Sequence, residues 1–242
     1  MVRTLFSIFV FTYFSLLFLV FFVIISLVFL ITFPFDRYRK APNFTLSIMA
    51  RFMMMASPGW KRQFEGLEKF DPSQPTVFVS NHQSFLDMVL IYHLPWKMKW
   101  VSKRSLTYIP VMGWLVWLTG HLTINRKSKT ALKKLENLVQ PLKDLVPVMI
   151  FPEGTRTMDG ELKSFKNGPF LLAQEHGFTL QPMVIDGGFK AMPPSSSKLN
   201  PNVQFKLKVL DPIDPSNFDG MKELKDHTRD IMEHHLKELR KT

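Results

Sequence analysis

The feature that most constrains the fold is an uncharged apolar run of 29 residues, from Leu5 to Phe33. At about 1.5 Å per residue, a helix of this length exceeds the ~30 Å hydrocarbon core of a bilayer. A cleaved signal peptide is the alternative, but the run is too long and no small-residue cleavage site follows it. We therefore expect an N-terminal transmembrane helix, so that residues 1–40 form a membrane anchor.

Charge is distributed unevenly around this run. Lys and Arg total 31 against 20 Asp and Glu, and of these cations only Arg3 precedes residue 34. By the positive-inside rule, the main domain lies on the cytoplasmic side of the membrane, which is the inner membrane in a bacterium. Its basic surface suits anionic lipid, an acidic substrate or an acidic carrier protein. Nucleic acid is a further possibility, but the sequence contains no recognisable nucleic-acid module, so we expect no nucleic-acid partner. Zero Cys excludes a disulfide and a cysteine acyl-enzyme.

A second apolar segment follows the anchor. Residues 44–56 are too few to span a bilayer and include Arg51. We expect residues 41–63 to form an interfacial amphipathic segment, and the alternative is a core helix of the domain. Residues 64–242 then form one catalytic domain.

Short apolar strands alternate with amphipathic helices through this domain, which predicts a layered α/β fold. The expected strands are 76–79, 97–102, 121–125, 146–151, 180–185 and 203–209. The expected helices are 85–94, 111–118, 129–139, 169–176 and 221–241.

Polar motifs follow two of the predicted strands, and ligands of α/β sheets gather beyond the carboxyl ends of strands. One motif contains His82 and Asp87, which lie five residues apart. On one helix they would point about 140° apart, so only a turn that folds His82 back brings them together. Asp87 could then accept the imidazole N–H and leave the other nitrogen to take a proton from a hydroxyl. Alternatively, Ser84 and Asp87 form a capping box that only stabilises the next helix, and the two roles are compatible.

The other motif is Pro152-Glu153-Gly154-Thr155-Arg156. Arg156 offers a planar fork suited to phosphate, with Arg126 and Lys103 as further cations. Gly154 permits an unusual backbone conformation or a close approach to a ligand. Alternatively, Arg156 is a surface charge or the partner of Glu153. We find no pattern of residues that suggests a metal site.

The segment Asn81 to Asp87 resembles the NHxxxxD motif of the glycerolipid acyltransferases, the lysophosphatidic acid acyltransferase family. Gly120 to Arg126 is similar to the second block of that family, Phe151 to Arg156 matches the third, and Pro182 to Ile185 resembles the weaker fourth. The departures are mild: Thr123 stands where an aromatic residue is common, and Asn125 where Asp is common.

The resemblance implies a layered α/β acyltransferase domain with a mixed central sheet. It also implies transfer of an acyl chain from acyl-CoA or acyl carrier protein to the sn-2 hydroxyl of 1-acyl-glycerol 3-phosphate (lysophosphatidic acid), giving phosphatidic acid at the membrane without a cofactor. The implied catalytic pair is His82 as general base and Asp87 as its orienting partner. The implied substrate-binding residues are Lys103, Arg126, Glu153, Gly154, Thr155 and Arg156.

Three alternatives stay open. The acceptor could be glycerol 3-phosphate, another lysophospholipid or a lyso-ornithine lipid. Ser84 could act as a nucleophile. The protein could also be a catalytically silent lipid-binding membrane protein, but such a protein is expected to have lost the histidine.

Overall fold

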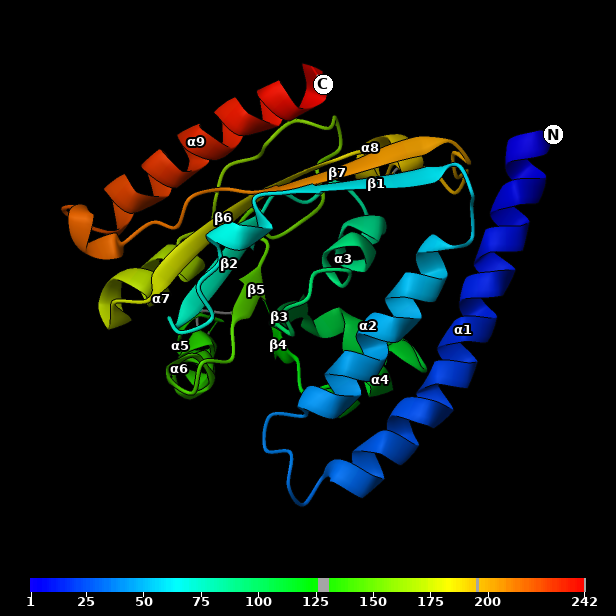
Figure 1. Cartoon of the computed structure of the whole chain (residues 1–242), viewed down its shortest axis with the longest axis horizontal. Coiled ribbons are helices and arrows are strands. Elements are labelled where there is room, and N and C mark those ends of the chain that lie inside the picture. The colour runs from blue at the N-terminus through cyan, green and yellow to red at the C-terminus, as the bar shows by residue number, and fades with distance from the viewer. Residues whose placement is uncertain (126–130, 195, 242) are drawn as a thin grey trace.

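The computed structural model describes residues 1–125, 131–194 and 196–241. In these residues a seven-stranded sheet forms the centre of the molecule, with strand order β1-β7-β6-β2-β5-β3-β4 (Figure 1). The strands are β1 (Trp60–Glu65), β2 (Thr76–Ser80), β3 (Lys99–Lys103), β4 (Leu122–Ile124), β5 (Val148–Ile150), β6 (Thr179–Asp186) and β7 (Val203–Val209).

The sheet is mixed, as the sequence resemblance implied. β6 and β7 pair antiparallel, and the other neighbouring strands pair parallel. The central strand β2 is buried along its whole length, because helices cover both faces of the sheet at this point. Because β2, β5 and β3 pair parallel, the carboxyl ends of all three strands lie at the same end of the sheet.

Strand β1 was not predicted, because its alternation of large apolar and charged residues is short and follows an apolar helix. It is an edge strand, and its parallel partner β7 begins at Val203, far along the chain. The boundary expected between residues 63 and 64 therefore falls inside a strand of the sheet.

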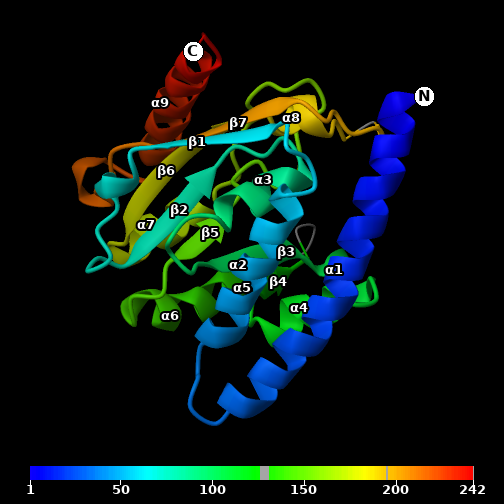
Figure 2. The same ribbon diagram turned by 45° about the vertical axis from the view of Figure 1, so that its right-hand side comes forward.

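Helices cover both faces of the sheet (Figures 1 and 2). One face carries α1 (Val2–Thr32), α2 (Lys40–Met54), α3 (Phe85–Ile91), α4 (Met112–Leu118) and α8 (Gly188–Ala191). The other face carries α5 (Ala131–Leu135), α6 (Val139–Lys143), α7 (Gly168–His176) and α9 (Met221–Lys241).

The helix expected over 129–139 is divided. A 3₁₀ turn, Glu136–Leu138, separates α5 from α6. Pro141 lies inside α6 and has no N–H, so it cannot donate the bond that a continuous helix would need at this point. The expected beginning of the helix at residue 129 lies outside the described residues.

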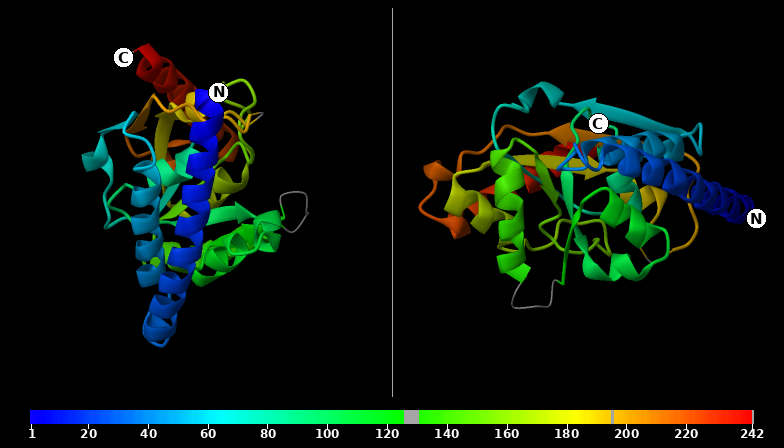
Figure 3. Two further views of the ribbon diagram at one scale, coloured as in Figure 1. Left: turned by 90° about the vertical axis from the view of Figure 1, so that its right-hand side faces the viewer. Right: turned by 90° about the horizontal axis from the view of Figure 1, so that it is seen from below.

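The long apolar N-terminal helix is confirmed. α1 runs antiparallel to α2 and packs along the domain (Figures 1 and 3). A stripe that includes Val10 and Ile25 is buried, while the opposite side of the helix is exposed. Both ends contact the domain: the Ser7 hydroxyl accepts a hydrogen bond from Leu199 N at 2.8 Å, and the Phe29 ring centroid lies 5.3 Å from that of Trp117.

Helix α2 covers the segment expected at the bilayer surface. It buries Met49, Met53 and Met54 in the core beside α1 and α3, and it exposes Phe44 and Phe52 on its other side. Methionine suits this position, because its unbranched chain fills irregular gaps. Contact between the exposed side and a bilayer stays a prediction.

Candidate active site

The turn after β2 is fixed by Asn81. Its side-chain amide donates to Ile185 O and its oxygen accepts from Ile185 N, both at 2.8 Å, so that the turn is tied to β6. The chain then folds back before α3 begins at Phe85. His82 Nδ1 consequently lies 3.0 Å from Asp87 Oδ2, which is the contact that the five-residue spacing required a turn to make.

Asp87 makes both of the contacts that the sequence suggested. Its Oδ2 also accepts from Gln83 N at 2.5 Å and Ser84 N at 2.7 Å, while Ser84 Oγ accepts from Leu86 N, completing the capping box at the start of α3. The carboxylate is fully buried. Since an ionised carboxylate can only accept, this network assigns the ring proton to His82 Nδ1. Nε2 then has a free lone pair, and it makes no hydrogen bond to the residues described.

The third sequence block and Thr157, the residue after it, hold the backbone of His82 from both sides. Glu153 Oε1 accepts from His82 N at 2.8 Å, and Thr157 N donates to His82 O at 2.8 Å. The imidazole stacks on Phe151, with 3.9 Å between ring centroids and 9° between planes. The two motifs therefore form one site, and the rotation of the imidazole is restricted.

Glu153 is buried, with 3% of its surface exposed. Its second oxygen accepts from Lys163 N at 3.3 Å. The alternative in which Glu153 pairs with Arg156 is therefore wrong: the carboxylate bonds to backbone N–H groups instead. Burial raises the pKa of Glu153 to about 7, although both backbone hydrogen bonds favour its ionised form.

The predicted cations lie around the same edge of the sheet. Lys103 ends β3 and Arg156 lies in the loop after β5, and these two strands are parallel neighbours. Among the described residues, no carboxylate forms an ion pair with either side chain. Gly154 has a φ of +72°, which favours glycine, and Thr155 is exposed. Arg126 lies outside the described residues.

The hydroxyl of Ser84 is already engaged. Ser84 is fully buried, and its Oγ donates to Met192 O at 3.0 Å while it caps α3. This arrangement provides neither a base nor access for a nucleophilic role. A possible metal-ligating group of Glu136, Glu175 and His176 lies at the opposite edge of the sheet, where Glu136 and His176 pair at 3.2 Å.

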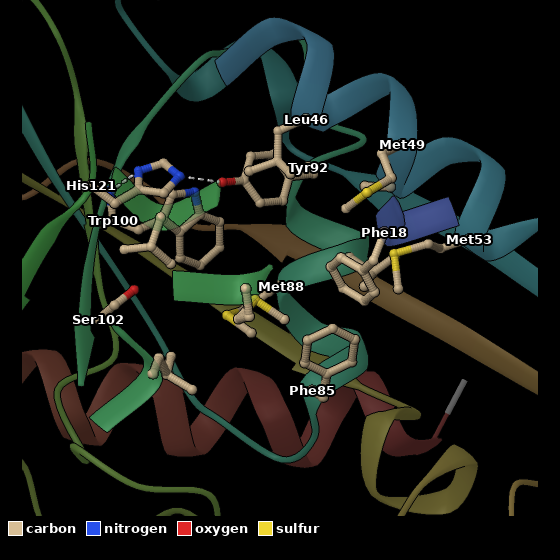
Figure 4. A pocket seen from close by; sticks show the side chains of 15 residues that line it. Phe18, Leu46, Met49, Met53, Phe85, Met88, Tyr92, Trp100, Ser102 and His121 are labelled. Carbon is tan, nitrogen blue, oxygen red and sulfur yellow. Dashed lines mark hydrogen bonds between the residues drawn. The ribbon is translucent and has the colours of Figure 1, made fainter. Parts of the chain in front are cut away.

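An apolar cavity of about 70 Å³ lies between α2, α3, α4 and β3 (Figure 4). Phe85 and Met88, which flank Asp87, line one part of it. The wall elsewhere contains Tyr92 and His121, which share a hydrogen bond of 2.7 Å. Burial holds the pKa of His121 well below its usual range, so this imidazole is neutral. Sequence reasoning missed this pair, because 29 residues separate its members. A second cavity, of about 660 Å³, adjoins Glu153 and Gly154.

Comparison with known proteins decides the family. The family model described as Acyltransferase matches residues 61–186, just over half of the 242 residues. The chain belongs to the acyltransferase family. The match contains both motifs of the site.

The relatives compared below are all described as 1-acyl-sn-glycerol-3-phosphate acyltransferases. This acyltransferase is 38% identical over 171 residues to a 1-acyl-sn-glycerol-3-phosphate acyltransferase of Chlamydomonas reinhardtii, covering 69% of this chain and 51% of the relative. An Escherichia coli protein of the same description is 34% identical, covering 68% of each chain. A putative one from Caenorhabditis elegans is 31% identical, covering 84% of this chain and 78% of the relative. The chain spans about half the length of its algal and plant relatives.

The fold also has a solved counterpart. The crystal structure of the 1-acyl-sn-glycerophosphate (LPA) acyltransferase from Thermotoga maritima superposes with a TM-score of 0.81 at 24% identity, covering 98% of both chains. The α/β fold and the N-terminal helices of this chain therefore have a known precedent.

Proposed function

We propose that this acyltransferase moves an acyl group from a thioester donor, acyl-CoA or acyl carrier protein, to the sn-2 hydroxyl of 1-acyl-glycerol 3-phosphate, producing phosphatidic acid. The observation that carries the proposal is the His82–Asp87 pair at 3.0 Å, which leaves His82 Nε2 with a free lone pair. The descriptions of the relatives support the choice of acceptor.

We propose direct transfer, without an acyl-enzyme intermediate. His82 Nε2 takes the proton of the acceptor hydroxyl as its oxygen attacks the thioester carbonyl. Asp87 stabilises the imidazolium formed in this step. The tetrahedral intermediate then expels the donor sulfur, which takes the proton from Nε2, so that an oxygen ester and a free thiol are released. Glu153 acts on the backbone of His82 and is thus a positioning residue.

Arg156 and Lys103 are proposed to bind the acceptor phosphate, with Arg126 as a third cation. The support is their position beside the carboxyl ends of adjacent strands and the absence of ion pairs with described carboxylates. A planar guanidinium can make two parallel bonds to a phosphate, whereas an ammonium acts as a point charge. Gly154 and Thr155 shape the loop that presents Arg156.

The apolar cavity of Figure 4 is proposed to receive part of an acyl chain. Its present volume admits only a short stretch of chain. Its lining includes Met49, Met53 and Met88, whose flexible side chains can move to extend it.

Membrane attachment is proposed to use the exposed side of α1. Among the helices in the described residues, α1 alone is long and apolar enough to cross a bilayer. Because both of its ends contact the domain, we propose that α1 embeds along its exposed side while the domain stays at the cytoplasmic surface.

The decisive test is purified protein in detergent with acyl-CoA, offered each acceptor in turn, with thioester consumption measured. We expect fast consumption with lysophosphatidic acid and little with monoacylglycerol, glycerol 3-phosphate or a lyso-ornithine lipid. His82→Ala is the matched control for donor hydrolysis. A preference for another acceptor would change the substrate assignment, and no transfer to any acceptor would favour the silent lipid-binding alternative.

A further inference from the structure

A third cavity, lined by cationic side chains, lies away from the reaction site. It has a volume of about 340 Å³ and lies between the α1–α2 turn, the end of α4 and the start of β4. Arg37, Arg39, Lys99, Trp117 and Gly120 are among the residues that line it. No step of the proposed transfer reaction uses any of them.

Lys99 is the unusual member of this wall. Only 4% of its surface is exposed, and its ammonium donates one hydrogen bond, to Thr119 O at 2.7 Å. Among the described residues no carboxylate forms an ion pair with it. Burial lowers its pKa to about 8, so the group is still largely charged at neutral pH. Asp36 favours this charge through space but forms no ion pair with it, so the cost of burying the charge is only partly offset, and a bound anion would offset more of it.

Arg39 points to the same place. Its backbone is in the left-handed region, with φ at +50°, and its guanidinium donates to Trp117 O while stacking 4.8 Å from the centre of the Trp117 ring. No described carboxylate pairs with Arg39 either. A Cβ added at Gly120 would lie 3.0 Å from both Arg39 Cδ and Lys99 Nζ. Two cations therefore converge over a glycine.

Capping of α4 explains only part of this arrangement. Arg39 and Lys99 each satisfy one carbonyl at the end of α4, as cations commonly do. This use leaves two ammonium protons and most of the guanidinium fork without protein acceptors. The nearby carboxylates are engaged elsewhere: Asp36 accepts from Ala41 N, and Asp144 accepts from Tyr38 and pairs with Arg37.

The cavity is separate from the proposed acceptor site. Lys99 begins β3 and Lys103 ends it. At about 3.3 Å per residue, these positions are roughly 13 Å apart along the strand. An anion at Lys99 is therefore at the opposite edge of the sheet from His82.

The surroundings favour a lipid as the source of the anion. Trp117 is 59% exposed beside the cavity, and Phe35, in the turn after α1, is 90% exposed. Exposed aromatic rings beside cations are typical of surfaces at the lipid headgroup level. We propose that the cavity binds the phosphate of an anionic phospholipid through Lys99 and Arg39. The choice of a lipid source rests on the membrane attachment proposed above.

The test measures binding without an acyl donor, so its failure is distinguishable from failure of the transfer assay. Full-length protein in a neutral detergent is titrated with dihexanoyl-phosphatidylglycerol, dihexanoyl-phosphatidylcholine or inorganic phosphate, and binding is followed by the rise in thermal midpoint. The variants are Lys99→Met and Arg39→Gln. Arg51→Gln on α2 is the control, because it removes an exposed charge outside the cavity. Lys99→Met should fold, since an apolar chain replaces a buried unpaired charge.

We expect the phosphatidylglycerol to bind the wild type more tightly than the other two ligands. Loss of one charge-assisted contact should weaken this binding about 10- to 100-fold in Lys99→Met and Arg39→Gln, and less than about 3-fold in Arg51→Gln. Equal binding of inorganic phosphate would overturn the lipid assignment. Wild-type affinity in folded Lys99→Met and Arg39→Gln would overturn the site and leave the two cations as caps of α4.

Discussion

The burial of Glu153 makes a quantitative prediction about stability. Its pKa is about 7 in the folded chain and 4.5 for an ordinary glutamate. Because the folded value is raised, protonated Glu153 contributes stability that is fully present below pH 4.5 and is lost as the pH rises through about 7. The full difference corresponds to about 3 kcal/mol, of which about 2 kcal/mol is lost between about pH 5.5 and about pH 8.5.

Glu153→Gln removes this dependence, because an amide does not ionise in that range. The assay is the thermal midpoint of wild type and Glu153→Gln at the two pH values in the same detergent. Other groups contribute equally to both proteins, so the double difference isolates Glu153. For a chain of this size about 2 kcal/mol corresponds to about 4–8 °C, with the wild type losing more on going to high pH. A double difference within about 1 °C would refute the reasoning that burial controls this carboxyl group.

Three further predictions concern activity and the anchor. His82→Ala should lower thioester consumption about 10²- to 10⁴-fold without loss of folding, and Asp87→Asn should lower it less. Wild-type turnover by folded His82→Ala would contradict the role of His82 as general base. Arg156→Ala should lower transfer to lysophosphatidic acid roughly 30- to 100-fold, and Arg156→Lys should retain part of the lost activity. An equal loss of transfer to monoacylglycerol, together with lower thermal stability, would show that Arg156 has a structural role. Deleting residues 1–35 should expose the buried side of α2 and cause aggregation in buffer, seen by size-exclusion chromatography, which a monodisperse fragment would contradict.

Local patterns predicted much of the fold. The apolar runs that became β2 and β6 could be located from sequence because they are continuous and bounded by turns. The contact of His82 with Asp87 was also foreseeable, since it needs only a turn between them. Edge strand β1 was not, because its identity depends on β7, about 140 residues later along the chain, which fixes its register through many paired residues.

The contacts that hold the site together could not be predicted from local sequence either, because they also join residues far apart in the chain. Glu153 has a carboxylate and stands near Arg156 in sequence, so pairing between them was a reasonable alternative. Its actual partners are backbone N–H groups, one of them 71 residues away at His82. Backbone donors carry no signature in the sequence, and only the three-dimensional arrangement reveals which of them a buried side chain satisfies.

The packing of α1 on the domain has a consequence for synthesis. Ser7 emerges from the ribosome 192 residues before its partner Leu199. At about 5–20 residues per second, the helix exists for roughly 10–40 s before that partner is made. Throughout this interval its buried stripe has no protein surface to cover it. Insertion into lipid during translation would protect the stripe, and completion of the chain would then exchange lipid for protein contacts on that side alone.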